Sequence, residues 1–178
     1  MNSLEKFYLQ TLKYDLINRF LYNNIKNLPE IKKIVLNFKC TKSDIKLLTS
    51  SLLVLKLITQ QKGLIIKTHS SNIILKIRKG TPIGCKTVLR NRQIFKFFFI
   101  LLVEIVPKLK NYDTVQITNN VFSFQLSDIS MFSRLKSHYY LFNNLPKLNI
   151  IVVTTSRKKK ELLFFIKSLL PTLKINFF

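Results

Sequence analysis

The 178-residue sequence contains no alanine and no tryptophan, and it has only three glycines, two cysteines and two histidines. Alanine is the best helix former, so its complete absence has no folding rationale. Its codons are GC-rich, whereas the codons of the abundant Phe, Ile, Asn and Lys are AT-rich. The composition therefore indicates an extremely AT-rich gene, typical of an organelle genome.

The scarcity of cysteine and histidine excludes a zinc site built by this chain alone. Cys40 and Cys85 could supply only two of four ligands, and His69 and His138 are not in zinc-ligand spacing. We expect two reduced thiols in or near the core.

Acidic residues are also scarce, with 8 against 30 basic residues, a formal net charge of +22 and a pI near 10.2. The acidic residues are scattered without motif spacing, and no Ser/His/Asp or Cys/His arrangement is recognisable, so a non-enzyme is favoured. The cations are spread along the whole chain, and such an excess repels itself unless polyanions neutralise it. Nucleic acid is therefore the leading partner class and an anionic membrane surface the second.

No apolar run is long enough to span a bilayer. The longest, residues 94–106, carries Lys96 and Glu104 and falls short of the roughly 20 apolar residues required. We expect a helix that is either deeply buried or docks a neighbouring protein through an outer stripe with Phe95 and Phe99. The N-terminus MNSLEKFYLQ resembles neither a signal peptide nor a transit peptide, which fits synthesis inside an organelle.

The periodicity of apolar residues predicts alternating helices and strands. Residues 1–178 are expected to form a single domain. The order indicates an α+β fold with a mostly antiparallel sheet and helices packed on one face, plus an extended basic hairpin arm. The expected elements are helices near 3–22, 44–60, 92–106 and 157–170, strands at 31–38, 64–69, 83–90, 121–128 and 148–155, a strand or hairpin arm at 71–77, and a loop at 107–120. Ser43-Asp44 and Asn91 are candidate helix caps.

Alternation within two of the strands predicts a basic sheet face. Lys33 and Asn37 point away from the apolar face of the first strand, and Lys86 and Arg90 share one face of the strand after the glycines. If helices cover only the other face, these four side chains form an open platform for RNA.

Gly80 and Gly84 lie among cations in KIRKGTPIGCKTVLR, residues 76–90. A Walker A loop needs G-x-x-x-x-G-K-[ST] between a strand and a helix. Here one residue is missing between the glycines, Cys85 separates Gly84 from Lys86, and a strand-like segment follows. We therefore expect a hairpin turn, whose lysines either contact RNA or are simply solvated.

A run of cations, Arg157 to Lys160, opens the last helix. Cations at a helix N-terminus oppose the helix dipole. The run is either a solvated basic turn or a phosphate contact, and its unfavourable placement favours the phosphate contact. Arg157 and Lys158 are therefore candidate rRNA-binding residues.

The segment from Lys76 to Arg90 resembles the K-I-R-Q-G-x-P-I-G-C-K-V-T-L-R-G-E-R motif of the large-subunit ribosomal protein L-five family, the 5S-rRNA-binding protein of the central protuberance. Pro29–Asn37 is similar to the family's V-P-x-[IV]-x-K-I-x-L-N, and Leu148–Thr155 to its L-D-I-x-I-x-T-T strand. The likeness runs in order over about residues 3–175.

The resemblance implies an α+β fold whose sheet side and nearby loops hold 5S rRNA. It carries an rRNA-binding role to Asn37, Gln61, Lys86 and Arg90. The family's R-G-E-R corresponds to Arg90-Asn91-Arg92-Gln93, in which the second arginine has moved by one place. Arg92 is added to the rRNA-binding candidates for its charge.

The resemblance also implies that residues 70–80 form an arm towards the elbow of P-site tRNA. The arm's candidate residues are Ser71, Lys76, Arg78 and Lys79. Ile73-Ile74 stands where the family has a small Ala-Gly tip.

The first hypothesis is a structural protein of the large subunit of a mitochondrial, rather than plastid, ribosome in the mitochondrial matrix. Its expected partners are 5S rRNA, large-subunit rRNA, P-site tRNA, neighbouring central-protuberance proteins and a small-subunit head protein, with no cofactor, metal or membrane. One alternative is an RNA-processing or RNA-modifying enzyme on a similar basic sheet, which would need a catalytic constellation. The other is a peripheral membrane-binding protein, which would need its cations concentrated in one amphipathic segment.

Overall fold

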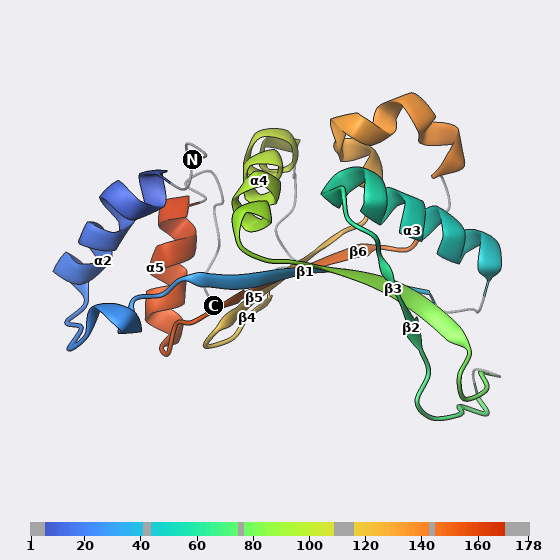
Figure 1. Cartoon of the computed structure of the whole chain (residues 1–178), viewed down its shortest axis with the longest axis horizontal. Coiled ribbons are helices and arrows are strands. Elements are labelled where there is room, and N and C mark those ends of the chain that lie inside the picture. The colour runs from blue at the N-terminus through green and yellow to red at the C-terminus, as the bar shows by residue number, and fades with distance from the viewer. Residues whose placement is uncertain (1–5, 41–43, 75–76, 109–115, 143–144, 170–178) are drawn as a thin grey trace. The chain divides into compact units, whose positions relative to one another are not determined.

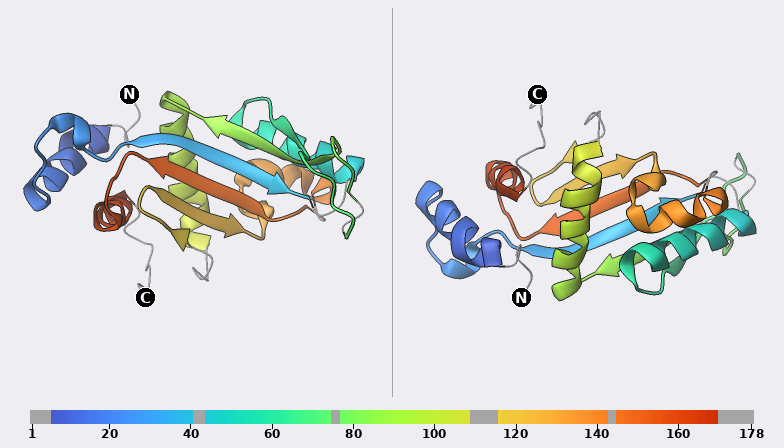
Figure 2. Two further views of the ribbon diagram at one scale, coloured as in Figure 1. Left: turned by 90° about the horizontal axis from the view of Figure 1, so that it is seen from below. Right: turned by 90° about the horizontal axis from the view of Figure 1, so that it is seen from above.

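The computed structural model describes residues 6–40, 44–74, 77–108, 116–142 and 145–169. Six strands form an antiparallel sheet in the order β2-β3-β1-β6-β5-β4 (Figures 1 and 2). The strands are β1 Ile31–Lys39, β2 Leu64–Lys67, β3 Pro82–Leu89, β4 Gln116–Ile117, β5 Val121–Leu126 and β6 Leu148–Thr154, and the helices α2 Lys13–Arg19, α3 Ile45–Thr59, α4 Arg92–Ile100 and α5 Lys159–Leu169. The predicted α+β class and the central position of residues 148–155 are confirmed.

Period-two alternation places the core on one side of the strands. The alternate side chains of β1 and β6 are buried, and the intervening ones are exposed or half-buried. Burying each large apolar side chain contributes about 1.5–3 kcal/mol, and a one-residue slip would expose them all. The buried strand residues are Ile34, Leu36 and Phe38 of β1 and Leu148, Ile150, Val152 and Thr154 of β6.

The chain divides into two compact units. Unit 1 comprises Met1–Ile34, Leu89–Phe124 and Ile151–Phe178, and unit 2 comprises Val35–Val88 and Gln125–Ile150. Strands β1, β3, β5 and β6 contribute residues to both. The expectation of a single domain stays a prediction.

In unit 2, α3 and the 3₁₀-helical segment Ser133–Leu141 lie on the same side of the strands (Figure 1). Arg134 Nη1 donates to the Ile58 carbonyl at 3.4 Å and links that segment to α3. The Cys85 thiol donates to Ser51 Oγ at 3.3 Å and links α3 to β3. Cys40 and Cys85 are both free and buried, as predicted.

In unit 1, α4 crosses one face of the strands, and α2 packs beside α5 (Figures 1 and 2). Aromatic contacts fix the second pair. The Phe20 and Phe164 ring centroids are 5.9 Å apart, and the Arg19 guanidinium carbon lies 4.6 Å from the centroid of the Phe164 ring. Each such contact stabilises the packing in addition to the apolar area that it buries.

Several predicted boundaries and caps are wrong. Asp44 and Asn91 occupy the N-cap positions of α3 and α4, but neither side chain makes a capping hydrogen bond; Ser43 lies outside the described residues. The helix predicted to end at 106 changes at Leu101 into a π-helical turn and then a 3₁₀ turn, Val106–Lys108. The predicted loop 107–120 contains β4.

The first and last helices also differ from the predicted ranges. The first contains a π-helical turn, Tyr8–Leu12, before α2. The last starts at Lys159, so Arg157 and Lys158 precede it. Within the described residues no helix has both the length and the apolarity to cross a membrane.

Candidate nucleic-acid interface

The face of unit 2 that lies opposite α3 carries polar and basic side chains. Asn37 and Lys39 of β1 alternate with the buried Leu36 and Phe38. Lys86 of β3 is exposed, whereas Cys85 and Thr87 on either side of it are buried. The alternation predicted for Asn37 and Lys86 is thus confirmed, and the half-buried Val88 shares their face.

The two glycines of the central motif serve the backbone. A Cβ on Gly84 would fall well inside van der Waals contact with the Phe38 carbonyl oxygen. Gly80 has a φ of +85°, a left-handed conformation that glycine adopts readily. Gly84 lies within strand β3 and does not open a helix, so it offers no helix N-terminus to hold phosphate and the mismatch with a Walker A loop stands.

The start of β3 contains a bulge. Ile66 of β2 pairs with Gly84 and Lys67 pairs with Pro82, which leaves Ile83 unmatched. The Cys40 N–H donates to the Ile83 carbonyl at 2.9 Å, so the bulge is tied to β1 on its other side. Beyond it the ladder is regular and holds Lys86 in its exposed position.

Gln61 lies in the connection from α3 to β2. Gln60 closes α3 in a left-handed conformation with φ +59° and ψ +19°, and the Gln61 N–H donates to Thr59 Oγ1 at 3.2 Å. Three residues later Leu64 pairs with Lys86 across β2 and β3. Gln61 is half-buried, so its backbone is fixed close to the strand that pairs with β3.

The predicted hairpin arm at 70–80 is not confirmed, and its residues 75–76 lie outside the described residues. Residues 71–77 were expected to be a strand or a hairpin arm, and among the described ones a single antiparallel bridge joins Asn72 to Ile77. Ile73 and Ile74 are more than 90% exposed, at 91% and 92%. Ser71, Arg78 and Lys79 are exposed as well, and Lys76 lies outside the described residues.

Hydroxyl groups close the base of this arm. Thr68 Oγ1 donates to the Arg78 carbonyl at 2.7 Å, and Thr81 Oγ1 donates to the same oxygen at 2.8 Å. The Gly80 N–H donates to the Thr68 carbonyl at 3.0 Å. The backbone of Arg78 is therefore held while its side chain stays in solvent.

The remaining cationic candidates belong to unit 1. Lys33 is half-buried on β1, and Arg90 and Arg92 are exposed on either side of Asn91. Arg157 and Lys158 are exposed just before α5. The Arg157 Nη2 donates to Asn27 Oδ1 at 3.2 Å, which orients the guanidinium.

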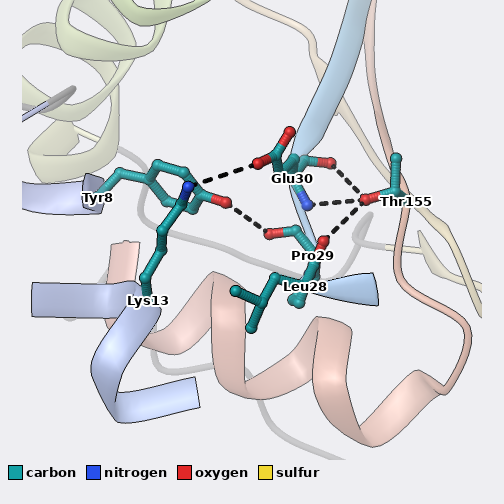
Figure 3. A network of polar contacts seen from close by, with 6 residues as sticks. All are labelled: Tyr8, Lys13, Leu28, Pro29, Glu30 and Thr155. Carbon is teal, nitrogen blue, oxygen red and sulfur yellow. Dashed lines mark hydrogen bonds and ion pairs between the residues drawn. The ribbon is translucent and has the colours of Figure 1, made fainter. Parts of the chain in front are cut away.

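A polar network fixes the chain that leads into Arg157 (Figure 3). The Thr155 N–H donates to the Glu30 carbonyl, and the Glu30 N–H donates to Thr155 Oγ1, both at 2.9 Å. Lys13 Nζ lies 3.7 Å from Glu30 Oε1, and the Tyr8 hydroxyl donates to the Pro29 carbonyl at 3.2 Å. These hydrogen bonds join the residue before β1 to the residue after β6. The backbone that leads to the cations after Thr155 is therefore held in place.

Unit 1 also contains the buried hydroxyl group of Tyr22. Its hydroxyl is buried and has no hydrogen-bond partner among the described residues. Burial, and to a lesser extent the Glu161 carboxylate, raise the pKa of Tyr22 to about 12.

Unit 1 also has an apolar cavity of about 190 Å³, lined by Tyr8, Leu9, Lys13, Glu30, Ile31, Phe95, Phe98 and Leu169.

The charges of the candidate residues are not neutralised locally. Among the described residues, Lys86, Arg90 and Lys158 form no ion pair. The part of the chain that the structure describes also holds no group of three or more His, Cys, Asp or Glu that could bind a metal ion. Cations without a local counter-charge can neutralise the phosphates of a nucleic acid, and amide side chains can hydrogen-bond it. This set of side chains therefore suits nucleic-acid binding better than catalysis.

Asn149 is a polar residue of this face that the sequence interpretation missed. It lies on β6 between the buried Leu148 and Ile150, so it projects to the side opposite the core. The same alternation that singled out Asn37 would have identified it.

Two known proteins similar to this chain are large ribosomal subunit proteins. The chain is 35% identical over 158 residues to "Large ribosomal subunit protein uL5m" of Reclinomonas americana, an overlap of 85% of this chain and 87% of that protein. It is 36% identical over 114 residues to "Large ribosomal subunit protein uL5" of Baumannia cicadellinicola subsp. Homalodisca coagulata, an overlap of 63% of each. No family model matches the chain.

Proposed function

Because the chain belongs to the uL5 family of large ribosomal subunit proteins, we propose that it binds 5S rRNA in the central protuberance of its ribosome. It is a structural constituent of the large subunit and not an enzyme. Its ribosome is the mitochondrial one, as its similarity to a uL5m protein and the AT-rich gene inferred from its amino-acid composition indicate.

The proposed rRNA contacts divide by chemistry. Lysines and arginines neutralise phosphates, and the amide groups of Asn37 and Gln61 offer hydrogen bonds to sugar or base. Unit 2 contributes Asn37, Gln61 and Lys86, and unit 1 contributes Lys33, Arg90, Arg92, Arg157 and Lys158. The fixed turn before Arg157 supports its inclusion, because an ordered cation loses less entropy on binding.

The segment from Ser71 to Lys79, whose residues 71–74, 78 and 79 are exposed, is the proposed contact with P-site tRNA. Arg78 and Lys79 supply cations at its base, where the backbone is hydrogen-bonded. Other surfaces of the chain meet neighbouring central-protuberance proteins and a protein of the small-subunit head.

One observation carries the rRNA proposal. The sheet face of unit 2 opposite α3 exposes Lys86 and also carries Asn37, whose Oδ1 has no hydrogen-bond partner among the described residues, in a protein with an excess of 22 positive charges. With 30 basic and 8 acidic residues, the chain cannot neutralise most of its own cations. A polyanion on that face offsets their repulsion.

Charge reversal tests this assignment. The Lys86→Glu/Arg90→Glu double variant should fail to enter large ribosomal subunits, measured by sedimentation of organelle extracts on a sucrose gradient. Recovery of the variant in large subunits at wild-type level would contradict the proposed face.

The matched control is Lys46→Glu/Lys56→Glu, which lowers the net charge by the same amount. Both lysines are exposed on α3, away from the proposed face of unit 2. This control should sediment with the subunit. If it is lost as completely as the first variant, total charge rather than the sheet face governs assembly.

A further inference from the structure

The apolar cavity of unit 1 has the size of one side chain. Its volume is about 190 Å³, and an apolar protein cavity of about 150 Å³ holds a benzene molecule. Tyr8 and Phe98 are buried parts of its wall, whereas Leu9 is 37% exposed and brings the cavity to the surface. The cavity therefore has room for a leucine or aromatic side chain that enters from outside.

An exposed apolar stripe continues from the cavity along α4 and the π-helical turn that follows it. Phe95 lines the cavity, and Phe99 and Val103 follow at intervals of four residues, which places them on the same side of the helix. Phe99 is 49% exposed and Val103 is 56% exposed. We call the surface formed by Leu9, Phe95, Phe99 and Val103 the α4 patch.

The charges beside the α4 patch restrict what can cover it. Lys13 and Glu30, which also line the cavity, pair with each other, whereas Lys96 is exposed and forms no ion pair among the described residues. An RNA phosphate would neutralise Lys96, but burying it against Phe99 and Val103 would leave its other oxygens without hydrogen bonds. Carboxylates and apolar side chains on one partner satisfy both the lysine and the stripe.

A second copy of the chain does not suit the α4 patch. Each copy carries 30 basic and 8 acidic residues, so two copies repel each other. The complementary partner is a different protein whose contact segment is acidic.

We propose that the α4 patch binds an acidic amphipathic segment of another large-subunit protein. A leucine or aromatic side chain of that segment fills the cavity, and its apolar neighbours cover Phe99 and Val103. An aspartate or glutamate of the same segment pairs with Lys96. This inference rests on the proposed contact with neighbouring proteins of the central protuberance, and it adds the surface of this chain and the chemistry of the partner.

Carbodiimide cross-linking of purified large subunits tests the proposal. The reagent joins a lysine amine to a carboxylate in contact with it, and mass spectrometry of the digested subunits identifies both peptides. The peptide that contains Lys96 should be joined to an aspartate or glutamate of another large-subunit protein. A leucine, phenylalanine, tyrosine or tryptophan should lie within four residues of that carboxylate, because residues three or four apart share one face of a helix.

Two variants test the cavity and the stripe separately. Leu9→Trp fills the cavity from its exposed side, and Phe99→Ser removes apolar area from a half-exposed side chain. Each should lower the yield of the Lys96 cross-link about five-fold, relative to the amount of the chain in the subunits. Ile45→Ser is the matched control, because Ile45 is 74% exposed on α3 of unit 2. It should leave the yield at the wild-type value.

Several results would overturn the proposal. Free acetylation of Lys96 by acetic anhydride in intact subunits would show that nothing covers the patch. A Lys96 peptide that carries an rRNA nucleotide after ultraviolet irradiation, with no carboxylate link, would identify RNA as the occupant. A link to a carboxylate of this same chain, or a yield that neither Leu9→Trp nor Phe99→Ser lowers, would show that no partner uses the patch.

The same experiment separates this inference from the proposed function. A Lys96 link to a large-subunit protein outside the central protuberance would support the α4 patch and contradict the proposed neighbours. The rRNA assignment is tested by Lys86→Glu/Arg90→Glu, whose residues lie outside the patch. Loss of the Lys96 link in wild-type subunits would therefore overturn the inference and leave the rRNA assignment in place.

Discussion

At Gly84 the backbone of β3 lies close to the backbone of β1. A Cβ there would meet the Phe38 carbonyl, which belongs to the backbone and cannot swing aside. At Gly80, in contrast, a Cβ would find nothing within 4 Å, and only the φ of +85° opposes a side chain. Glycine is therefore favoured at the two positions for different physical reasons, a close backbone contact at Gly84 and a left-handed conformation at Gly80.

Alanine substitutions at these glycines should have unequal effects. Gly84→Ala is expected to lower the free energy of unfolding by about 3 kcal/mol, because the strands must separate. Gly80→Ala should cost about 1 kcal/mol, the penalty of a left-handed non-glycine residue. Urea denaturation measures both, and equal losses would show that steric contact with Phe38 is not what requires Gly84.

Asn91 is held in a conformation that suits glycine. Its φ of 53° and ψ of −133° lie outside the region that asparagine commonly visits, and its side chain forms no cap. Asn91→Gly should therefore raise the free energy of unfolding by about 1 kcal/mol.

Gln60→Gly provides the comparison for Asn91→Gly. Gln60 has a φ of 59° and a ψ of 19°, an ordinary left-handed conformation, so its replacement should gain less. Thermal denaturation of the two variants ranks them. A stability loss in Asn91→Gly would contradict the assigned strain.

Alternation made most of the candidate face predictable at the residue scale. Asn37 and Lys86 were found because each lies between buried neighbours. Asn149 satisfies the same rule but was overlooked within an apolar strand. The contact that requires Gly84 joins two strands far apart in the sequence, so no local pattern reveals it.

At the scale of elements, strands were predicted more accurately than helix ends. The core residues of β1 and β6 repeat with period two, and tertiary burial enforces that pattern. Helix ends depend on backbone groups that propensity does not specify, as the uncapped Asp44 and the π-helical turn at Leu101 illustrate. The hairpin arm stays a prediction, because among its described residues a single bridge, Asn72 to Ile77, is present.

The Tyr22 hydroxyl makes the packing of unit 1 sensitive to alkali. Burial and the Glu161 carboxylate raise its pKa to about 12, whereas an unfolded tyrosine titrates near 10. The folded state thus holds the proton more tightly. Its contribution to stability is complete below pH 10 and is lost as the pH rises from 10 towards 12.

Tyr22→Phe isolates this titration. Relative to the variant, the wild-type protein should lose free energy of unfolding steadily between pH 10 and pH 12, as measured by urea denaturation at each pH. At neutral pH the variant should be at least as stable, because the hydroxyl has no partner among the described residues. Parallel pH profiles for the two proteins would refute the raised pKa.

At the scale of the whole molecule, charge decides the function more than any single residue. The net charge of +22 disfavours the isolated folded chain, and the cations are dispersed instead of gathered in a tail. Among the described residues of unit 2, the sheet face opposite α3 exposes Lys86, which can neutralise phosphate while the core stays intact. The family membership and the exposed basic face agree on a ribosomal RNA partner.

The most direct test of the central claim is the affinity of the full-length protein for 5S rRNA over a salt series. The logarithm of the affinity should fall linearly with the logarithm of the salt concentration. The slope of this line should steepen by about 0.7–0.9 for each phosphate contacted. The Lys86→Glu/Arg90→Glu variant should bind more weakly and with a slope smaller by about two contacts. Binding that ignores salt, or equal affinity for an unrelated RNA at physiological salt, would contradict the account.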